Sequence, residues 1–198
     1  MRRPHRYCVW RKQIKMSLDP RNCYNLAHQT GVEERGLNLF QIRWKCKTLC
    51  RHYFNGDVTE KTFKRIYREN DKDIFRTLES METRLDNLLF RAHLAASVYQ
   101  ARKIARDGGL LVNGEKSEFA SRRLKPGDLV QVADKFKAQV RKIADNPFLK
   151  LWAFIPKYVE VDYETMSFVL VDRPRFDDIP SPYPKEMVRK MGEFYRRF

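Results

Sequence analysis

Apolar residues recur at helical spacing in the middle of the chain, and a short apolar strand follows them. In the first predicted helix they form one stripe, made of Leu85, Leu88, Leu89 and Ala92. Ser97 can cap a second helix, whose buried stripe contains Val98, Ala101, Ile104 and Ala105. Gly108 or Gly109 supplies its left-handed stop. Residues 110–112 and the Asn113-Gly114 pair then predict a strand that enters a primed hairpin turn.

The polar positions of these two helices are mostly basic. Beside the first apolar stripe we expect three side chains to meet solvent or a ligand: Arg84, Asn87 and Arg91. The second helix presents Tyr99, Arg102, Lys103 and Arg106. Two cationic stripes beside a hairpin fit a duplex or a junction of phosphate backbones. Asp86 has no second acid or nucleophile at a recognisable spacing, so we expect it to orient Arg84 or a helix terminus rather than to act as a base.

Three more helices are predicted before this stretch, and they suggest a compact helical domain. Asn38 can cap the first, which runs to about Tyr53 with an apolar stripe of Leu39, Ile42, Cys46, Leu49, Cys50 and Tyr53. Beside that stripe lies a basic ridge of Arg43, Lys47 and Arg51. Thr59 starts the next helix, which buries Phe63, Ile66 and Tyr67 and shows Lys61, Lys64, Arg65 and Arg68. Residues 71–86 supply the third.

The C-terminal quarter mixes several patterns. Residues 141–156 are expected to return the chain toward the helical part, and alternating residues 158–171 predict a short hairpin with a break near Glu164-Thr165. Residues 172–184 contain four prolines, so we expect an extended segment rather than a helix or a central strand. Residues 185–198 then form an amphipathic helix that ends in Arg196 and Arg197.

A net charge of +15 disfavours an ordinary soluble enzyme and indicates a polyanionic partner. Nucleic acid is preferred to an acidic membrane surface, because no apolar run is long enough for a membrane span. Residues 1–30 combine basic residues with Tyr7, Trp10 and Tyr24, which suits an RNA-contacting arm. A cleaved mitochondrial transit peptide is the alternative; Trp10 and the lack of a clean amphipathic Arg/Ser helix favour a retained arm.

No metal, cofactor or catalytic residue is expected. The cysteines, Cys8, Cys23, Cys46 and Cys50, fit neither a disulfide framework nor a common zinc or iron–sulfur spacing. A metal site stays conceivable, but Cys46 and Cys50 fall on an apolar stripe and are expected to be buried thiols. The four histidines are scattered, and no phosphate-binding glycine loop is present.

Five pieces in order, RLDNLLFR, AASVYQARK, GG, LVNGE and KPGD, resemble the RNA-binding domain of bacterial-type ribosomal protein S-four. YFNGDVTEKTFKRIYREN and IFRTLES are similar to the helical domain of that family, and the tail resembles its C-terminal segment, which folds back onto the helical domain. The implied fold class is α+β: a basic N-terminal helical domain with an inserted domain of two helices and a small twisted hairpin or sheet. The expected boundaries are 1–83, 84–145 and 146–198.

The resemblance implies a structural component of the small ribosomal subunit. Such a protein binds a helix junction in the 5′ domain of small-subunit rRNA early in assembly, lies near the site where mRNA enters, and has neighbours of the uS-three and uS-five types. It implies no membrane partner and no small-molecule substrate. The implied RNA face contains Arg84, Arg91, Tyr99, Gln100, Arg102, Lys103, Arg106, Asn113 and Lys116, together with the helical-domain cations Arg43, Lys47, Arg51, Lys64, Arg65 and Arg68.

Two departures from the bacterial pattern refine this expectation. Bacterial members usually carry a basic residue where this chain has Val98, which puts one phosphate contact in doubt. The arm with NLFQIRWK and the IPSPYP tail look more like the fungal mitochondrial branch, so the resemblance implies the mitochondrial matrix.

Two other functions use the same RNA-binding domain: an accessory subunit or anchor of an RNA-modifying enzyme, and a stress factor that binds stalled large subunits. Pseudouridine synthases and tyrosyl-tRNA synthetases also carry this domain, but they need a further catalytic domain, for which we expect no room in 198 residues. A stress factor would need neither the helical domain nor the returning tail. Because Arg84 and Arg102 lie off the apolar stripes, reversing both to Glu is expected to leave the protein folded.

Overall fold

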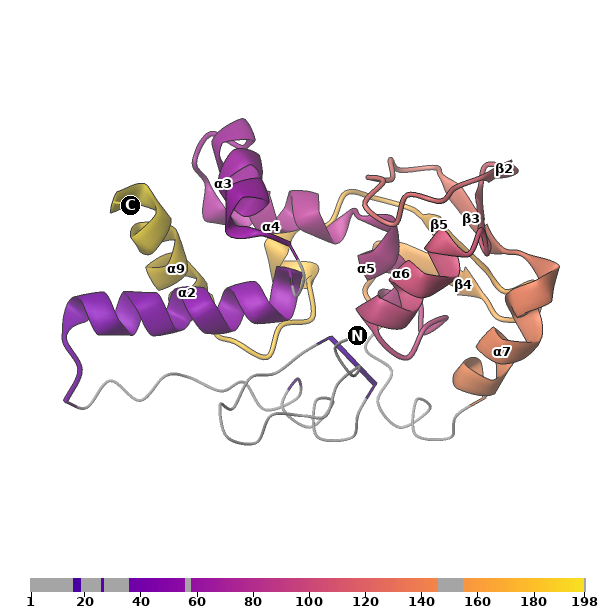
Figure 1. Cartoon of the computed structure of the whole chain (residues 1–198), viewed down its shortest axis with the longest axis horizontal. Coiled ribbons are helices and arrows are strands. Elements are labelled where there is room, and N and C mark those ends of the chain that lie inside the picture. The colour runs from indigo at the N-terminus through magenta and orange to yellow at the C-terminus, as the bar shows by residue number, and fades with distance from the viewer. Residues whose placement is uncertain (1–15, 19–25, 27–35, 56–57, 146–154, 198) are drawn as a thin grey trace. The chain divides into compact units, whose positions relative to one another are not determined.

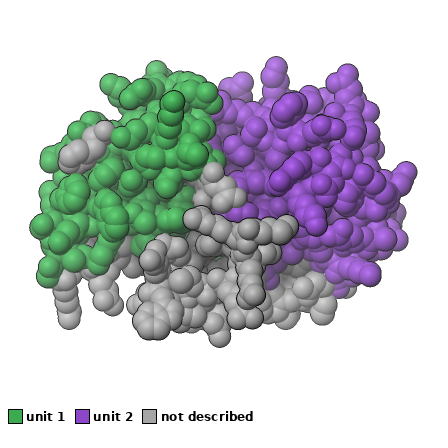
Figure 2. Space-filling view, in the orientation of Figure 1, with its two compact units in different colours: residues 1–15, 21–78, 181–198 green, residues 16–20, 79–180 purple. Residues whose placement is uncertain are grey.

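The computed structural model describes residues 16–18, 26, 36–55, 58–145 and 155–197, and its fold is α+β (Figure 1). The chain forms two compact units (Figure 2). We call them the helical unit (residues 1–15, 21–78 and 181–198) and the sheet unit (residues 16–20 and 79–180). The sheet unit is therefore an insertion between two parts of the helical unit. Among the described residues, no helix combines the length and the apolar character needed to cross a membrane.

The helical unit contains α2 (Leu39–Asn55), α3 (Glu60–Glu69), the first turns of α4 (Ile74–Glu82) and α9 (Lys185–Arg197). Polar side chains cap α2 and α3 where the sequence predicted. The Asn38 Oδ1 accepts from the Gln41 N–H at 2.8 Å, and the Gln41 Oε1 accepts from the Asn38 N–H at 3.1 Å. The Thr59 hydroxyl likewise accepts from the Thr62 N–H at 3.3 Å.

Helix α9 packs along α2, so the C-terminal helix returns to the helical unit as expected. Aromatic rings line the contact between α9 and its neighbours, with the centroids of Phe63 and Tyr195 4.8 Å apart. Cys46 and Cys50 are fully buried and form no disulfide, which confirms the expectation for these two residues. Burial raises the pKa of the Cys50 thiol, which keeps it protonated and unreactive. Leu39 departs from the predicted stripe, because 53% of its surface is exposed at the first residue of α2.

The sheet unit begins with α5 (Leu85–Arg91) and α6 (Val98–Arg106), whose predicted apolar faces are buried. Next come β1 (Leu110–Val112), β2 (Glu115–Lys116), β3 (Leu129–Val132), α7 (Asp134–Ala144), β4 (Val159–Asp162) and β5 (Ser167–Leu170). The strands form one antiparallel sheet in the order β2-β1-β3-β5-β4. Val130, at the centre of β3, is paired with Val112 on one side and with Phe168 on the other.

Positive φ angles lie where the sequence predicted turns. Asn113 (54°) and Gly114 (84°) form the primed turn between β1 and β2, and Gly108 (68°) ends α6. The Asn113 side chain also ties this turn to β3: its Oδ1 accepts from the Leu129 N–H, and its Nδ2 donates to Asp128, both at 2.9 Å. The hairpin is thereby held against the centre of the sheet.

The β4–β5 hairpin forms as expected but belongs to a different part of the fold. It was predicted within a segment returning to the helical domain, whereas β5 pairs with β3 inside the sheet unit. The physical reason is that β3 would otherwise present an unpaired edge. Helix α7 was not predicted, and residues 146–154 lie outside the described residues. The proline-rich segment contains one turn of 3-10 helix at Phe176–Asp178 instead of being extended throughout.

His93 links the stability of the sheet unit to pH. Its side chain is buried (6% exposed), and burial, together with the nearby positive charge of Arg91, lowers its pKa from 6.5 to about 4. The unfolded chain therefore takes up a proton at a higher pH than the folded chain does. Stability is complete above pH 6.5 and is lost as the pH falls toward 4.

We expect the free energy of unfolding to be lower at pH 5 than at pH 7.5 by about 2 kcal/mol from this residue alone. Urea titrations at the two pH values measure it. His93→Asn is the matched control, because Asn tolerates the positive φ (57°) at this position and does not titrate. The same pH dependence in both proteins would contradict the assignment.

Candidate nucleic-acid interface

The start of α5 is closed by backbone from a distant segment. The N–H groups of Leu85 and Asp86 have no partner within the helix, and they donate to the carbonyls of Arg122 (2.9 Å) and Ala120 (3.1 Å). The Leu124 N–H donates in turn to the Thr83 carbonyl at 2.9 Å. This pairing includes a bridge between Arg84 and Arg123, so it gathers basic residues that lie far apart in the sequence.

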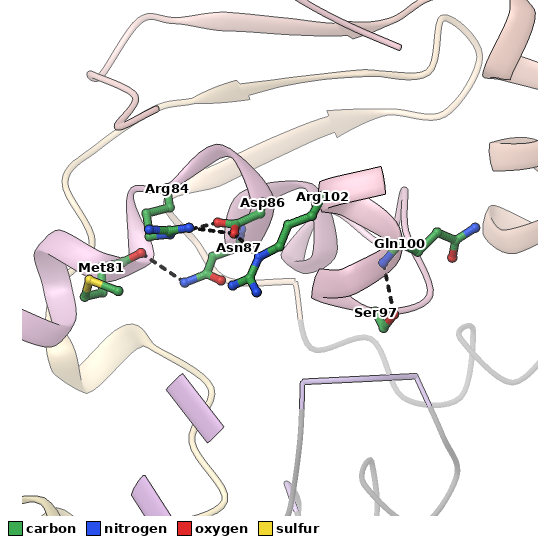
Figure 3. Close-up of polar contacts among 7 residues, drawn as sticks. All are labelled: Met81, Arg84, Asp86, Asn87, Ser97, Gln100 and Arg102. Carbon is green, nitrogen blue, oxygen red and sulfur yellow. Dashed lines mark hydrogen bonds and ion pairs between the residues drawn. The ribbon is translucent and has the colours of Figure 1, made fainter. Parts of the chain in front are cut away.

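A buried carboxylate joins the two predicted cationic stripes (Figure 3). Asp86 is fully buried, and Arg84 donates to it through Nε (3.0 Å) and Nη2 (2.8 Å). Arg102 donates to the same carboxylate through Nε at 2.6 Å. The expectation that Asp86 orients Arg84 is confirmed, and it orients Arg102 as well. We call these three residues the Asp86 cluster.

Side-chain contacts within a few residues stabilise the start of α6 and position Arg102. The Ser97 hydroxyl accepts from the Gln100 N–H at 3.3 Å, and the Gln100 Oε1 accepts from the Ala96 N–H at 2.9 Å. Gln100 therefore helps to cap the helix. The guanidinium of Arg102 lies over the Tyr99 ring, 5.5 Å from its centroid. Two predicted RNA-facing side chains, Tyr99 and Gln100, thus also organise the helix that carries the cations.

Two predicted solvent-facing residues of α5 are buried instead. Arg91 is 2% exposed and pairs with Glu82, whose carboxylate also accepts from the Tyr158 hydroxyl at 3.1 Å. Asn87 is also 2% exposed, and its Nδ2 donates to the Met81 carbonyl at 2.9 Å. The predicted exposure was wrong because every residue of this short helix is covered, so polar side chains find partners inside the unit.

The exposed cations among the predicted residues of the sheet unit lie on α6 and beside the turn between β1 and β2. Among the predicted residues, Lys103, Arg106, Asn113 and Lys116 are exposed, and Lys116 pairs with Glu118 at 3.2 Å. Three exposed basic residues of the β2–β3 connection were not predicted: Arg122, Arg123 and Lys125. The run SRRLK signals them, but only the backbone pairing to α5 shows that Arg122 and Arg123 adjoin Arg84.

The predicted basic ridge of α2 is an internal seam of the helical unit. Arg43 pairs with Glu193 of α9 at 2.6 Å, and Lys47 and Arg51 both pair with Glu60 of α3 at 3.3 Å. Their side chains are only 12%, 15% and 24% exposed, in that order. Acidic residues of neighbouring helices thus neutralise the ridge, and the role in RNA binding that was expected of it stays a prediction. On α3, Arg65 and Arg68 are exposed and Lys64 is half-buried.

The exposed and ion-paired cations of the sheet unit suit electrostatic binding of a polyanion. Within the described part of the chain, no group of three or more His, Cys, Asp or Glu side chains could hold a metal ion. Cys8 and Cys23 lie outside the described residues, as does most of the arm at 1–30. In the Asp86 cluster one carboxylate pairs with two guanidinium groups, so the cluster keeps a net positive charge and both arginines are held in place.

Comparison with known proteins gives one consistent family. The S4 domain family matches residues 83–130, which span α5, α6 and most of the first three strands. Small ribosomal subunit protein uS4 of Novosphingobium aromaticivorans is 37% identical over 162 residues, or 80% of this chain and 77% of that protein. The uS4 protein of Ruegeria sp. is 33% identical over 174 residues, or 85% and 82%. Small ribosomal subunit protein uS4m of Schizosaccharomyces pombe is 25% identical, covering 100% of this chain and 82% of that protein.

The Asp86 cluster changes what substitutions there should do. Reversing Arg84 and Arg102 to Glu would place three carboxylates together around a buried position, so we now expect it to unfold the sheet unit rather than to leave the protein folded. A milder change isolates the role of the carboxylate. Asp86→Asn keeps the shape but removes the charge that both guanidinium groups share.

We expect Asp86→Asn to lower the free energy of unfolding by about 2–3 kcal/mol, measured by urea denaturation. Asp107→Asn is the control: it removes the same charge from an exposed position at the end of α6. If the two variants lost equal stability, the buried carboxylate would not be the organising charge.

Proposed function

Because this chain belongs to the family of small ribosomal subunit protein uS4, it is a structural, rRNA-binding constituent of the small ribosomal subunit, and we propose that the sheet unit binds a folded rRNA junction through the cations around the Asp86 cluster. The observation that carries the proposal is the shared carboxylate between Arg84 and Arg102. It presets two guanidinium groups beside exposed lysines and arginines, and little side-chain entropy is then lost on binding.

The physical basis is multivalent neutralisation of phosphate. Each basic side chain that meets a phosphate releases condensed counterions, so affinity grows with the number of contacts and falls with salt. Cations cannot read a base sequence by themselves. Selectivity therefore comes from the shape of the RNA, which must bring several phosphates to fixed positions at once.

The proposed RNA face of the sheet unit combines predicted residues with those that the fold adds. It contains Arg84, Tyr99, Gln100, Arg102, Lys103, Arg106, Asn113, Lys116, Arg122, Arg123 and Lys125. In the helical unit, the residues proposed to contact RNA are Lys64, Arg65 and Arg68. Arg91, Arg43, Lys47 and Arg51 support the fold of their units through ion pairs. Their proposed contribution to RNA binding is to position other residues.

The finer assignment follows the family resemblance. We propose that the RNA is the junction in the 5′ domain of small-subunit rRNA, that binding occurs early in assembly, and that neighbours of the uS-three and uS-five types and the path of entering mRNA lie nearby. The similarity to uS4m of S. pombe over the whole chain supports a mitochondrial ribosome, although bacterial uS4 proteins match as well. A non-enzymatic role accords with these relatives, which are named as ribosomal proteins. An accessory role in an RNA-modifying or stress-response complex is the alternative.

Sedimentation separates the ribosomal role from the alternative. We expect the endogenous protein to co-migrate with the small subunit on a sucrose gradient of mitochondrial lysate and to crosslink to the 5′ domain of its rRNA. A large-subunit protein blotted from the same fractions is the control. Migration as a free protein, or crosslinks mainly to tRNA or to the large subunit, would favour the alternative.

A second experiment tests the proposed RNA face of the sheet unit. Lys103 and Arg106 are exposed on α6, so replacing both with Ala should leave the fold intact. We expect the slope of log affinity against log salt for the 5′-domain rRNA to become shallower by about 1.5 to 2, as the loss of two phosphate contacts requires. The matched control removes two exposed lysines elsewhere in the sheet unit, Lys142 and Lys157. Equal changes in both double variants would indicate a general charge effect instead of a defined face.

A further inference from the structure

The connection between β2 and β3 holds an apolar ring in solvent on a firmly anchored backbone. On one side of Phe119, Ser117 is 4% exposed and its N–H donates to the Leu110 carbonyl at 2.9 Å. On the other side, the carbonyl of Ala120 accepts from the Asp86 N–H. The Arg122 N–H also donates to the Phe119 carbonyl at 3.0 Å, which closes a turn. Backbone hydrogen bonds within a few residues on each side therefore fix the position of Phe119.

The Phe119 ring is 75% exposed, more than any other large apolar side chain in the described part of the chain. Leu39, Phe40 and Trp44 of the helical unit follow at 53%, 51% and 49%. Keeping a Phe ring in water rather than burying it forgoes about 1.5–3 kcal/mol. Because the backbone on both sides is anchored, the ring is displayed by the fold and is not the end of a loose segment.

The surroundings of the ring identify its partner by charge. Three basic residues of the same connection are exposed, Arg122, Arg123 and Lys125. Its one exposed acid, Glu118, already pairs with Lys116 of β2 at 3.2 Å. An apolar protein surface would have to desolvate these cations in order to cover the ring. A nucleotide offers both parts of the match, a phosphate for the cations and a base with a π-face for the ring.

We propose that Phe119 stacks on an unpaired nucleobase of the rRNA that binds the sheet unit, while Arg122 and Arg123 hold the adjoining phosphates. The inference rests on the proposed function and adds a contact to an unpaired nucleotide, which a continuous duplex does not offer. A base inside a duplex has both faces covered, so only a looped-out or junction base can receive the ring. Phe119 thereby makes the sheet unit favour a junction over a plain helix.

The test uses the full-length protein and an in-vitro transcript of the 5′ domain of small-subunit rRNA, with a fully paired duplex RNA as the reference probe. Stacking on an aromatic side chain contributes about 1–3 kcal/mol per base, so Phe119→Ala should bind the transcript about 5- to 150-fold more weakly. Duplex binding and the salt slope should not change, because no charge is removed. Thermal unfolding should also be unchanged, since the ring is exposed.

Two further substitutions separate stacking from simple apolar contact. Phe119→Trp should retain the affinity of the unchanged protein, because the larger ring also stacks, whereas Phe119→Leu should bind as weakly as the Ala variant. Val171→Ala is the matched control: it trims another exposed apolar side chain of the sheet unit (46% exposed), and binding should not change. Ultraviolet crosslinking should join the peptide containing Phe119 to one unpaired nucleotide.

The failures are distinguishable. If the unchanged protein binds the transcript no better than the duplex, the proposed function itself fails and the inference falls with it. If it prefers the transcript and Phe119→Ala or Phe119→Leu binds equally well, only the stacking is overturned. Normal transcript binding by Phe119→Ala, combined with loss of that variant from the small-subunit fraction of a gradient, would assign the ring to a neighbouring protein and would also overturn it.

Discussion

The carboxylate of Asp86 is the charge on which the arrangement of the sheet unit depends. It is fully buried, and it accepts hydrogen bonds from Arg84, from Arg102 and from the Asn87 N–H. A buried carboxylate is costly without such partners, and two guanidinium groups would repel each other without it. The cluster therefore connects α5 to α6 and sets the direction of both arginines. The backbone N–H of the same residue, donating to Ala120, also anchors the β2–β3 connection.

The basic residues of this chain fall into two groups with different roles. Arg43, Lys47, Arg51 and Arg91 are paired with acidic residues inside their own units, and their main effect is on the fold. Lys103, Arg106, Arg122 and Lys125 are exposed and contribute to the field that a polyanion meets. The net charge of +15 does not distinguish these two groups, because it only subtracts the acidic residues from the basic ones. Counting the exposed ones describes the binding surface better.

The five-stranded sheet extends beyond the part of the chain that matches the S4 domain family. That match ends at residue 130, within β3, and β5 then pairs along the other side of β3. The addition of β5 and β4 covers an edge that would otherwise expose unpaired N–H and C=O groups. The chain then leaves the sheet unit, and α9 packs on α2. The inserted unit is thus closed on itself before the C-terminal helix completes the helical unit.

The sequence by itself determined most of the elements and much of their local chemistry, although α7 was not among them. Periodicity located α5 and α6, Asn38, Thr59 and Ser97 marked helix starts, and Asn113-Gly114 marked the primed turn, because these signals act between residues a few positions apart. Only the tertiary structure decided which cations are exposed and where the β4–β5 hairpin belongs. Arg91 meets Glu82 nine positions away and Arg43 meets Glu193 150 positions away. Pairing at such separations leaves no periodic trace, so it is decided by packing and by the need to neutralise buried charge.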